Sequence, residues 1–107
     1  MASIGFVNGT IEKGFVGQLK TLSIRAAIEI RINPAKNGDV QPDFRVHSEG
    51  VEIGAGWVRT GEASGKPYVS LTLAAPEFGP RRIYANLGRA AGQDSDDAYA
   101  IIWNPAD

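Results

Sequence analysis

The 107-residue chain has the size and composition of one soluble globular domain, with 43% hydrophobic and 21% charged residues. It contains no cysteine, which excludes a disulfide scaffold, thiolate zinc sites and thiol catalysis. Eleven basic residues against 12 acidic ones give a net charge of −1, which argues against a dedicated duplex-DNA binder, since such domains usually have a pI above about 9.

The charges are unevenly distributed along the chain. No basic residue follows Arg89, whereas the acidic residues Asp94, Asp96, Asp97 and Asp107 all lie beyond it. We therefore expect a mildly basic body and an acidic tail. The sequence shows no signal-peptide pattern at its start and no run of roughly 18 apolar residues. The expected location is the cytoplasm, without a membrane partner.

Three strands are predicted in the first third of the chain. The tracts "ASIGFVNG" and "GFVGQLKTL" indicate two short strands, with Asn8-Gly9 as a turn signal between them. In "SIRAAIEIRI", every second position from Leu22 to Ile32 is apolar and the other positions are mostly polar. This alternation predicts a half-buried strand, with a bulge or bend because strands of more than ten residues are unusual.

The loop "NPAKNGDVQPD" separates these strands from five more candidates. These are "FRVHS", Val51–Arg59, Pro67–Leu73, "RRIYANL" and "AYAIIW", the last covering the closing strand 99–103 after an acidic loop at 92–98. "GRAAGQ" could hold a single helical turn. The prediction is one all-β domain over residues 1–107, a small antiparallel β-barrel or sandwich of six to seven strands with little or no helix.

The hairpin between the fifth and sixth of the eight candidate segments has glycines where a strand normally carries side chains. Placing its apolar positions in the core puts Gly54 opposite Ser70 and Gly56 opposite Tyr68 on the outer face. In that register the Tyr68 ring covers bare backbone, a known compensation for glycine in a sheet. The alternatives are a sharp coil or the close approach of another backbone, as at a barrel corner, and a ligand-binding surface.

No catalytic or metal-binding motif is complete. His47 is the only histidine, "GAGWVR" lacks the third glycine of a dinucleotide fingerprint, and no G-K-[ST] phosphate loop occurs. "DSDDAYA" lacks the glycine and the distal glutamate of a calcium loop. We therefore expect no enzymatic activity, no metal and no cofactor. A hydrolase would require a pocket that gathers His47 with Glu49 or Glu52.

Basic and aromatic residues at outward strand positions favour a binding role. Small antiparallel barrels that bind single-stranded nucleic acid combine a basic groove with exposed aromatic rings. The residues expected to form such a surface are Arg25, Arg31, Arg59, Lys66, Tyr68 and Tyr84. A purely structural explanation is also open, since outward charges protect sheet edges and the two tyrosines could cover each other or Gly56. Trp57 and Trp103, at apolar positions, are expected in the core.

A protein-interaction module is the alternative function. An exposed strand edge can accept a partner strand, and tyrosine and arginine are favoured at the centres of interfaces. Such a module would act through a sheet edge or through the face that carries Tyr68, and it could form a homodimer.

A series of tracts in fixed order covers nearly the whole chain: "SIGFV", "GFVGQLKTLSI", "PDFRV", "EIGAGWVRT", "GKPYVSLTL", "PEF", "IYANL" and "IIW". In content and order they resemble the small bacterial family catalogued as domain of unknown function 736. The resemblance implies a small β protein encoded largely on bacterial plasmids and integrative elements, without an established activity. This mobile-element context suggests either handling of single strands during DNA transfer or binding of a host protein, for example to blunt a defence system.

Overall fold

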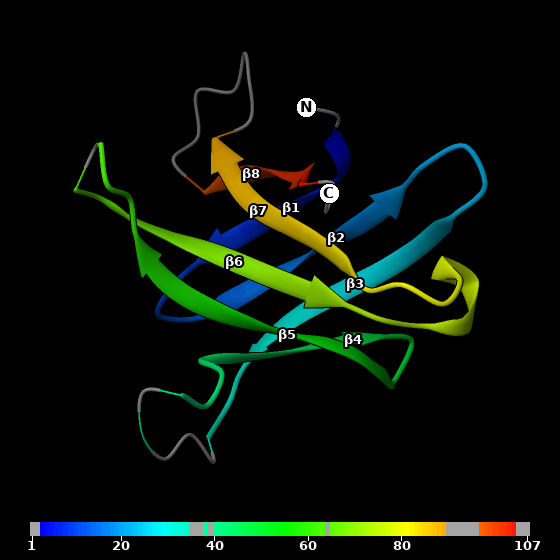
Figure 1. The fold of residues 1–107 in the computed structure, drawn as a ribbon, viewed down its shortest axis with the longest axis horizontal. Coiled ribbons are helices and arrows are strands. Elements are labelled where there is room, and N and C mark those ends of the chain that lie inside the picture. The colour runs from blue at the N-terminus through cyan, green and yellow to red at the C-terminus, as the bar shows by residue number, and fades with distance from the viewer. Residues whose placement is uncertain (1–2, 35–37, 39, 64, 90–96, 105–107) are drawn as a thin grey trace.

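The computed structural model describes residues 3–34, 38, 40–63, 65–89 and 97–104. Its eight antiparallel strands follow one another around a closed barrel, in which β8 pairs with β1 (Figure 1). The strands are β1 (Ser3–Thr10), β2 (Gly14–Lys20), β3 (Arg25–Ile32), β4 (Phe44–Ser48), β5 (Val51–Thr60), β6 (Pro67–Leu73), β7 (Ile83–Arg89) and β8 (Ala98–Trp103). Within the described ranges the helical content is one short 3₁₀ helix, η1 (Pro76–Phe78), and no helix could cross a bilayer.

The expected all-β fold is therefore confirmed; of the two architectures expected, barrel or sandwich, it is a closed barrel, with eight strands rather than six to seven. All eight segments read from the sequence contain a strand. Two finer expectations, a helical turn in "GRAAGQ" and the acidic loop at 92–98, fall largely on residues 90–96, which lie outside the described residues.

The barrel interior is filled by side chains that alternate along each strand. Ile28 and Ile30 of β3 are each 1% exposed, as the alternation in "SIRAAIEIRI" predicts. The buried apolar core consists of Val7, Phe15, Leu19, Ile28, Ile30, Phe44, Val46, Ile53, Val69, Leu71, Leu73, Ala85, Leu87 and Ile101. Aromatic rings fill one end of the barrel, where Phe15 contacts Tyr99 edge-on with 5.5 Å between the ring centroids.

Of two local expectations in the first third of the chain, one is met in part and one is wrong. The run from Leu22 to Ile32 is not a single strand, because β3 begins only at Arg25 and pairs regularly with β2; the expected bend lies before it, at Leu22 and Ser23, where Leu22 is fully exposed. The Asn8-Gly9 pair does not form the first turn. Both residues pair within the β1–β2 ladder, and the turn follows at residues 11–13.

The predicted register of the β5–β6 hairpin is also wrong. Gly56 pairs with Leu71 rather than with Tyr68, and Tyr68 pairs with Arg59. The partner of Gly56 thus moves from residue 68 to residue 71, an odd shift that turns the β5 side chains from position 54 onward to the opposite face of the sheet, while Val69, Leu71 and Leu73 of β6 stay in the core as expected. Gly54 and Gly56 consequently face the barrel interior, and Tyr68 does not cover them.

A β-bulge in β5 explains the shift. Val46 of β4 pairs with Gly54 and His47 pairs with Glu52, so that Ile53 is an extra residue on the bulged strand. Ile53 is buried, and from Gly54 onward the inward positions become the even-numbered ones. The bulge therefore reverses the parity that the start of the strand indicates.

The two glycines leave room for neighbouring side chains and backbone in the interior. A Cβ atom on Gly56 would lie 3.0 Å from the Leu71 side chain and 3.4 Å from that of Phe44. A Cβ atom on Gly54 would overlap the carbonyl oxygen of Thr72 and lie 2.9 Å from the Leu73 side chain. Of the explanations open at the sequence level, the close approach of another backbone applies to Gly54, whereas Gly56 leaves room for core side chains.

Candidate functional site

The outer surface of β4 to β7 carries one continuous row of paired residues. Arg45 pairs with Ala55, Ala55 with Thr72, and Thr72 with Tyr84. Directly paired residues of an antiparallel sheet point to the same face. The small side chains of Ala55 and Thr72 therefore separate Arg45 from Tyr84 on one side of the barrel, where Tyr84 is 39% exposed.

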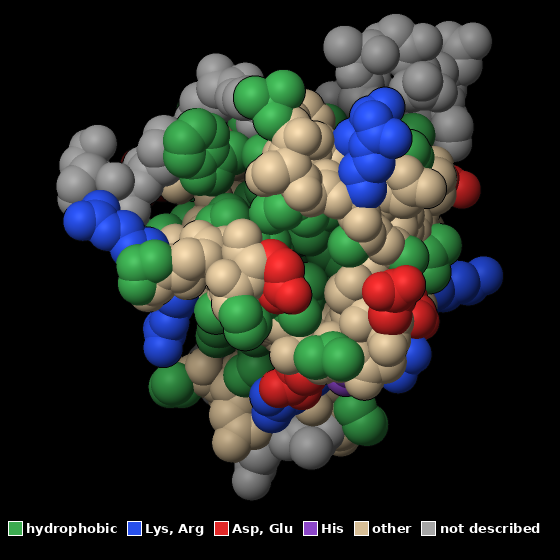
Figure 2. All heavy atoms as spheres, turned by 90° about the vertical axis from the view of Figure 1, so that its right-hand side faces the viewer, with side chains coloured by type: hydrophobic (Ala, Val, Ile, Leu, Met, Phe, Trp, Pro, Cys, Tyr) green, Lys and Arg blue, Asp and Glu red, His purple; other side chains and the backbone are tan. Residues whose placement is uncertain are grey.

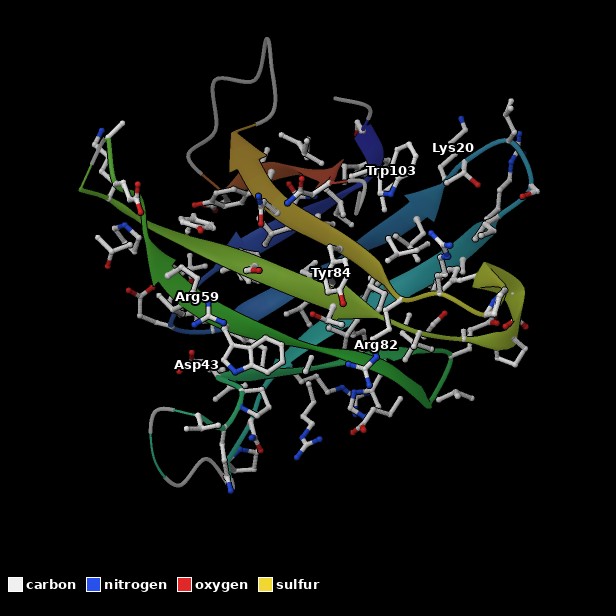
Figure 3. The ribbon with its side chains drawn as sticks, viewed as in Figure 1. Lys20, Asp43, Arg59, Arg82, Tyr84 and Trp103 are labelled. Atoms are coloured by element: carbon white, nitrogen blue, oxygen red, sulfur yellow. The ribbon has the colours of Figure 1, made fainter. Side chains whose placement is uncertain are left out.

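Two further rows extend this surface toward the β5–β6 turn. Trp57 pairs with Ser70, and in the next outward row Arg59 pairs with Tyr68. Outward rows of a strand lie about 7 Å apart. We call this surface the aromatic–basic face; it consists of Arg45, Trp57, Arg59, Tyr68 and Tyr84. Figure 3 shows Arg59 and Tyr84 on the side of the barrel formed by β5, β6 and β7.

Trp57 is the central ring of the aromatic–basic face. Its indole Nε1 donates a hydrogen bond to the Val40 carbonyl oxygen at 3.1 Å. The guanidinium carbon of Arg59 lies 5.8 Å from the ring centroid, within the range of a cation–π contact. The expected core position of Trp57 is wrong, because the bulge in β5 turns this residue outward. The two contacts fix the ring on the surface before any ligand arrives.

The segment before β4 is attached to β5 beside this tryptophan. A carboxylate oxygen of Asp43 accepts a hydrogen bond of 2.8 Å from the Val58 backbone N–H. The Asp43 backbone N–H donates to the Gly56 carbonyl oxygen at 2.9 Å. These bonds flank Trp57 along β5, so they hold the strand that positions the ring and the loop that carries Val40.

Three of the six residues predicted from the sequence lie on this face. Arg59 and Tyr68 are direct partners, and Tyr84 is the partner of Thr72. Because Tyr68 and Thr72 are about 13 Å apart along β6, the two tyrosines occupy opposite ends of the face. They are partly exposed and too far apart for direct ring stacking.

The other three predicted residues lie at its border or away from it. Arg31 pairs with Arg45 across β3 and β4, but its guanidinium forms an ion pair with Glu29 at 3.1 Å. Lys66 is exposed in the β5–β6 turn, just before Tyr68. Arg25 is exposed at the opposite end of β3 from Arg31, about 20 Å along the strand, and is not part of the face.

Sequence reasoning missed two residues of the face, Arg45 and Trp57. The alternation in "FRVHS" was sufficient to place Arg45 outward, since Phe44 and Val46 are the apolar positions of that strand. No comparable signal existed for Trp57, because the glycines at 54 and 56 carry no side chain that would reveal the change of parity.

His47 does not belong to either of two cavities in the structure. It lies between Glu29 of β3 and Glu52 of β5 on the outer face, and its Nδ1 atom is buried without a hydrogen-bond partner among the described residues. A cavity of about 250 Å³ beside β2 and β3 and the larger one described below are both lined by other residues. In the described part of the chain no three His, Cys, Asp or Glu side chains form a metal-binding group.

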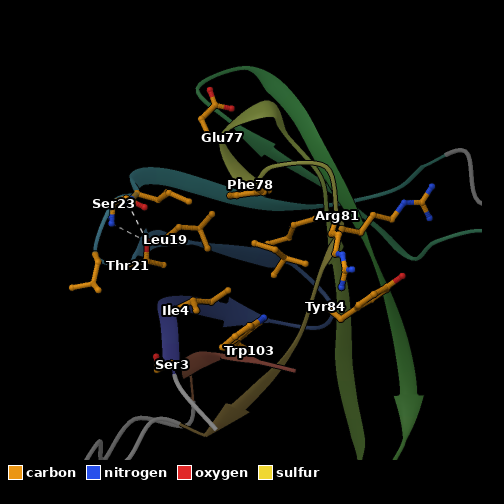
Figure 4. A pocket seen from close by; sticks show the side chains of 15 residues that line it. Ser3, Ile4, Leu19, Thr21, Ser23, Glu77, Phe78, Arg81, Tyr84 and Trp103 are labelled. Atoms are coloured by element: carbon orange, nitrogen blue, oxygen red, sulfur yellow. Dashed lines mark hydrogen bonds between the residues drawn. The ribbon is translucent and has the colours of Figure 1, made fainter. Parts of the chain in front are cut away.

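The larger cavity, of about 950 Å³, opens at the end of the barrel opposite the Phe15–Tyr99 contact. It is lined by the start of β1 and β7, the ends of β2, β6 and β8, the β2–β3 turn and η1 (Figure 4). Trp103, which was expected in the core, is 41% exposed at the mouth of this cavity. Its position at the end of β8, where the barrel opens, explains the difference.

One comparison with known proteins gives a match. A family model described as "Protein of unknown function (DUF736)" matches residues 3–106. No curated protein and no solved structure matches the chain. The match covers all eight strands, and its description names no activity.

Proposed function

We propose that this chain, which belongs to the DUF736 family of proteins of unknown function, is a non-enzymatic accessory protein that binds single-stranded nucleic acid. The observation that carries the proposal is the aromatic–basic face, where Trp57, Tyr68 and Tyr84 lie with two arginines on one side of a closed barrel. Stacking of a base on an aromatic side chain contributes about 1–3 kcal/mol and tolerates any sequence. The rings lie in different rows, so each can take a different base.

The charges around the face suit the phosphate backbone of a single strand, which carries fewer charges per unit length than a duplex. Arg45 forms an exposed ion pair with Glu52 at 3.6 Å, and Arg31 forms one with Glu29. Exposed pairs of this kind contribute little to stability, so a phosphate group can replace the carboxylate at modest cost. Binding should therefore be strongest at low salt and should weaken as salt rises.

The cellular setting of the proposal comes from the family resemblance. Carriage on bacterial plasmids and integrative elements would expose the protein to single-stranded DNA during transfer. We accordingly propose that it acts in the bacterial cytoplasm as an accessory of such an element.

A protein-binding role on the same face is the second candidate. Tryptophan, tyrosine and arginine are the residue types most enriched at the energetic centres of interfaces, and Trp57, Tyr68 and Arg59 form such a group. The other route, addition of a partner strand, loses its basis because all eight strands are paired on both sides. Partner proteins and a second copy of the chain would therefore compete with nucleic acid for the aromatic–basic face.

Fluorescence anisotropy with a labelled oligonucleotide of roughly 16 nucleotides tests the first candidate. The protein should bind the single strand at low salt, bind the matched duplex more weakly, and release both as salt is raised. Absence of binding at low salt would rule out the nucleic-acid role. In that case, sedimentation and pull-down from the host would decide whether the face takes a second copy or another protein.

A further inference from the structure

The cavity at the open end of the barrel has the dimensions of a small-molecule site. Its volume of about 950 Å³ lies at the upper end of the roughly 300–1,000 Å³ typical of ligand pockets. Eight-stranded barrels have an interior just wide enough to be filled by side chains or to hold one small ligand. Here core side chains fill the middle of the barrel and Phe15 packs on Tyr99 at the opposite end, so the larger cavity lies at one end of the barrel.

The inner walls of this cavity are apolar. Leu19 and Leu73, at 2% and 0% exposure, belong to the core and lie behind its inner end. Ile4, Phe78 and Ile83 pack against that core from β1, η1 and β7 and continue the lining outward. Figure 2 looks onto this side of the molecule and shows hydrophobic side chains within the hollow and charged ones around it. A ligand that binds in this cavity must therefore contain a compact apolar part.

The mouth of the cavity carries a net positive charge. Arg81 and Arg82, in the connection between η1 and β7, are exposed lining residues without an ion pair among the described residues. Glu77 is the one carboxylate among the lining residues, and in Figure 4 its carboxylate points away from the other labelled side chains. Two guanidinium groups beside one carboxylate favour an anionic group over a neutral or cationic one.

The polar groups on the other side of the mouth are largely engaged within the protein. The Thr21 hydroxyl oxygen accepts hydrogen bonds from the backbone N–H groups of Ser23 and Ile24, at 3.4 and 3.0 Å. The Ser3 hydroxyl donates to the Gly5 carbonyl oxygen at 3.0 Å. The two arginines are therefore the main groups available to recognise a polar part of the ligand.

We infer that this cavity binds a small amphiphilic anion, with its apolar body against Ile24, Phe78 and Ile83 and its carboxylate at Arg81 and Arg82. The filled barrel interior limits the apolar part to a short chain or a compact ring system, which excludes a full-length membrane lipid. The site is separate from the proposed nucleic-acid surface except at Tyr84, which contributes to both.

Titration calorimetry with decanoate, kept below its micellar concentration, tests this inference with decanol as the uncharged probe of equal length. Decanoate should bind at one equivalent and more tightly than decanol. Replacing both arginines, R81A with R82A, should weaken decanoate binding about tenfold or more and leave decanol binding unchanged. The matched control R25A removes an exposed arginine outside the cavity lining and should change neither.

A second variant tests the apolar part of the site. Ile24→Trp places a larger side chain in the lining, so it should abolish binding of both probes while thermal unfolding shows that the barrel still forms. Equal affinity for decanoate and decanol, or no binding of either to the wild-type protein, would overturn the inference. W57A should bind decanoate like the wild type, which separates this site from the proposed nucleic-acid surface.

Discussion

The guanidinium group of Arg59 lies over the ring of Trp57, 5.8 Å from its centroid, on the outer surface of the barrel. The Trp57 side chain is half-buried in this position, and the Val40 carbonyl oxygen fixes its edge. The cation–π contact holds a positive charge beside the ring, as a stacked base with an adjacent phosphate requires.

Removing the Trp57 ring should weaken binding of a single strand without unfolding the protein. Loss of one stacked base corresponds to about 1–3 kcal/mol, or an affinity lower by about 5-fold to 150-fold. Fluorescence anisotropy of W57A measures the change. The matched control is F6A, which removes an outward aromatic ring from β1, 49% exposed. If F6A and W57A weaken binding equally, the aromatic–basic face is not the binding surface.

The salt dependence of the affinity for a single-stranded oligonucleotide should reveal the phosphate contact of Arg45. For single strands, each neutralised phosphate contributes a slope of about −0.7 to the logarithm of affinity against the logarithm of salt concentration. R45A should therefore make the slope less steep by about 0.7. R25A should leave it unchanged, because Arg25 lies away from the face. A slope that responds to Arg25 and not to Arg45 would place the strand on another part of the barrel.

A methyl group at position 54 should destabilise the barrel. The Cβ atom of G54A would overlap the Thr72 carbonyl oxygen, a backbone atom that cannot move without disturbing the β5–β6 ladder. We expect a loss of about 1–3 kcal/mol in the free energy of unfolding, measured by urea denaturation. The neighbouring substitution A55V, on the outer face, should change it by less than about 0.5 kcal/mol. Equal stability of the two variants would contradict the inward position of Gly54.

The Asp43 carboxylate should matter both for the stability of the barrel and for the position of the Trp57 ring. D43A removes the acceptor of the Val58 N–H bond, and hydrogen bonds to charged groups contribute about 1.5–3 kcal/mol. We expect lower stability in urea and a change in tryptophan fluorescence, because the segment that carries Val40 is released from Trp57. E62A removes an exposed carboxylate in the β5–β6 turn and serves as the control. Unchanged tryptophan emission in D43A would show that Asp43 does not position the ring.

The sequence was sufficient to predict the strands and most of their faces. In β3, β6 and β7 the apolar and polar positions alternate without interruption, so Ile28, Leu71 and Tyr84 could be assigned to a face directly. Closure of the barrel could not be predicted, since the pairing of β1 with β8 joins opposite ends of the chain. The resulting strand order removes the free edges on which the strand-addition hypothesis depended.

Neither Trp57, at the centre of the aromatic–basic face, nor the end cavity could be predicted from the sequence, and the physical reasons differ. At the bulge, Ile53 is an extra residue that reverses the inward and outward positions of β5. The two glycines that follow have no side chain to indicate which face each position occupies, so Trp57 was assigned to the core. The cavity is formed by strand ends and turns that are distant in the sequence, from Ser3 to Trp103. No local pattern indicates that those ends leave a space between them.

The most direct test uses the indole N–H signals of the two tryptophans in a nitrogen–proton correlation spectrum. Titration with a single-stranded oligonucleotide should shift the Trp57 signal, since its ring is central to the aromatic–basic face, and should leave that of Trp103 nearly unchanged. Decanoate should have the opposite effect, because Trp103 lines the end cavity. An oligonucleotide that binds without moving the Trp57 signal would contradict the account.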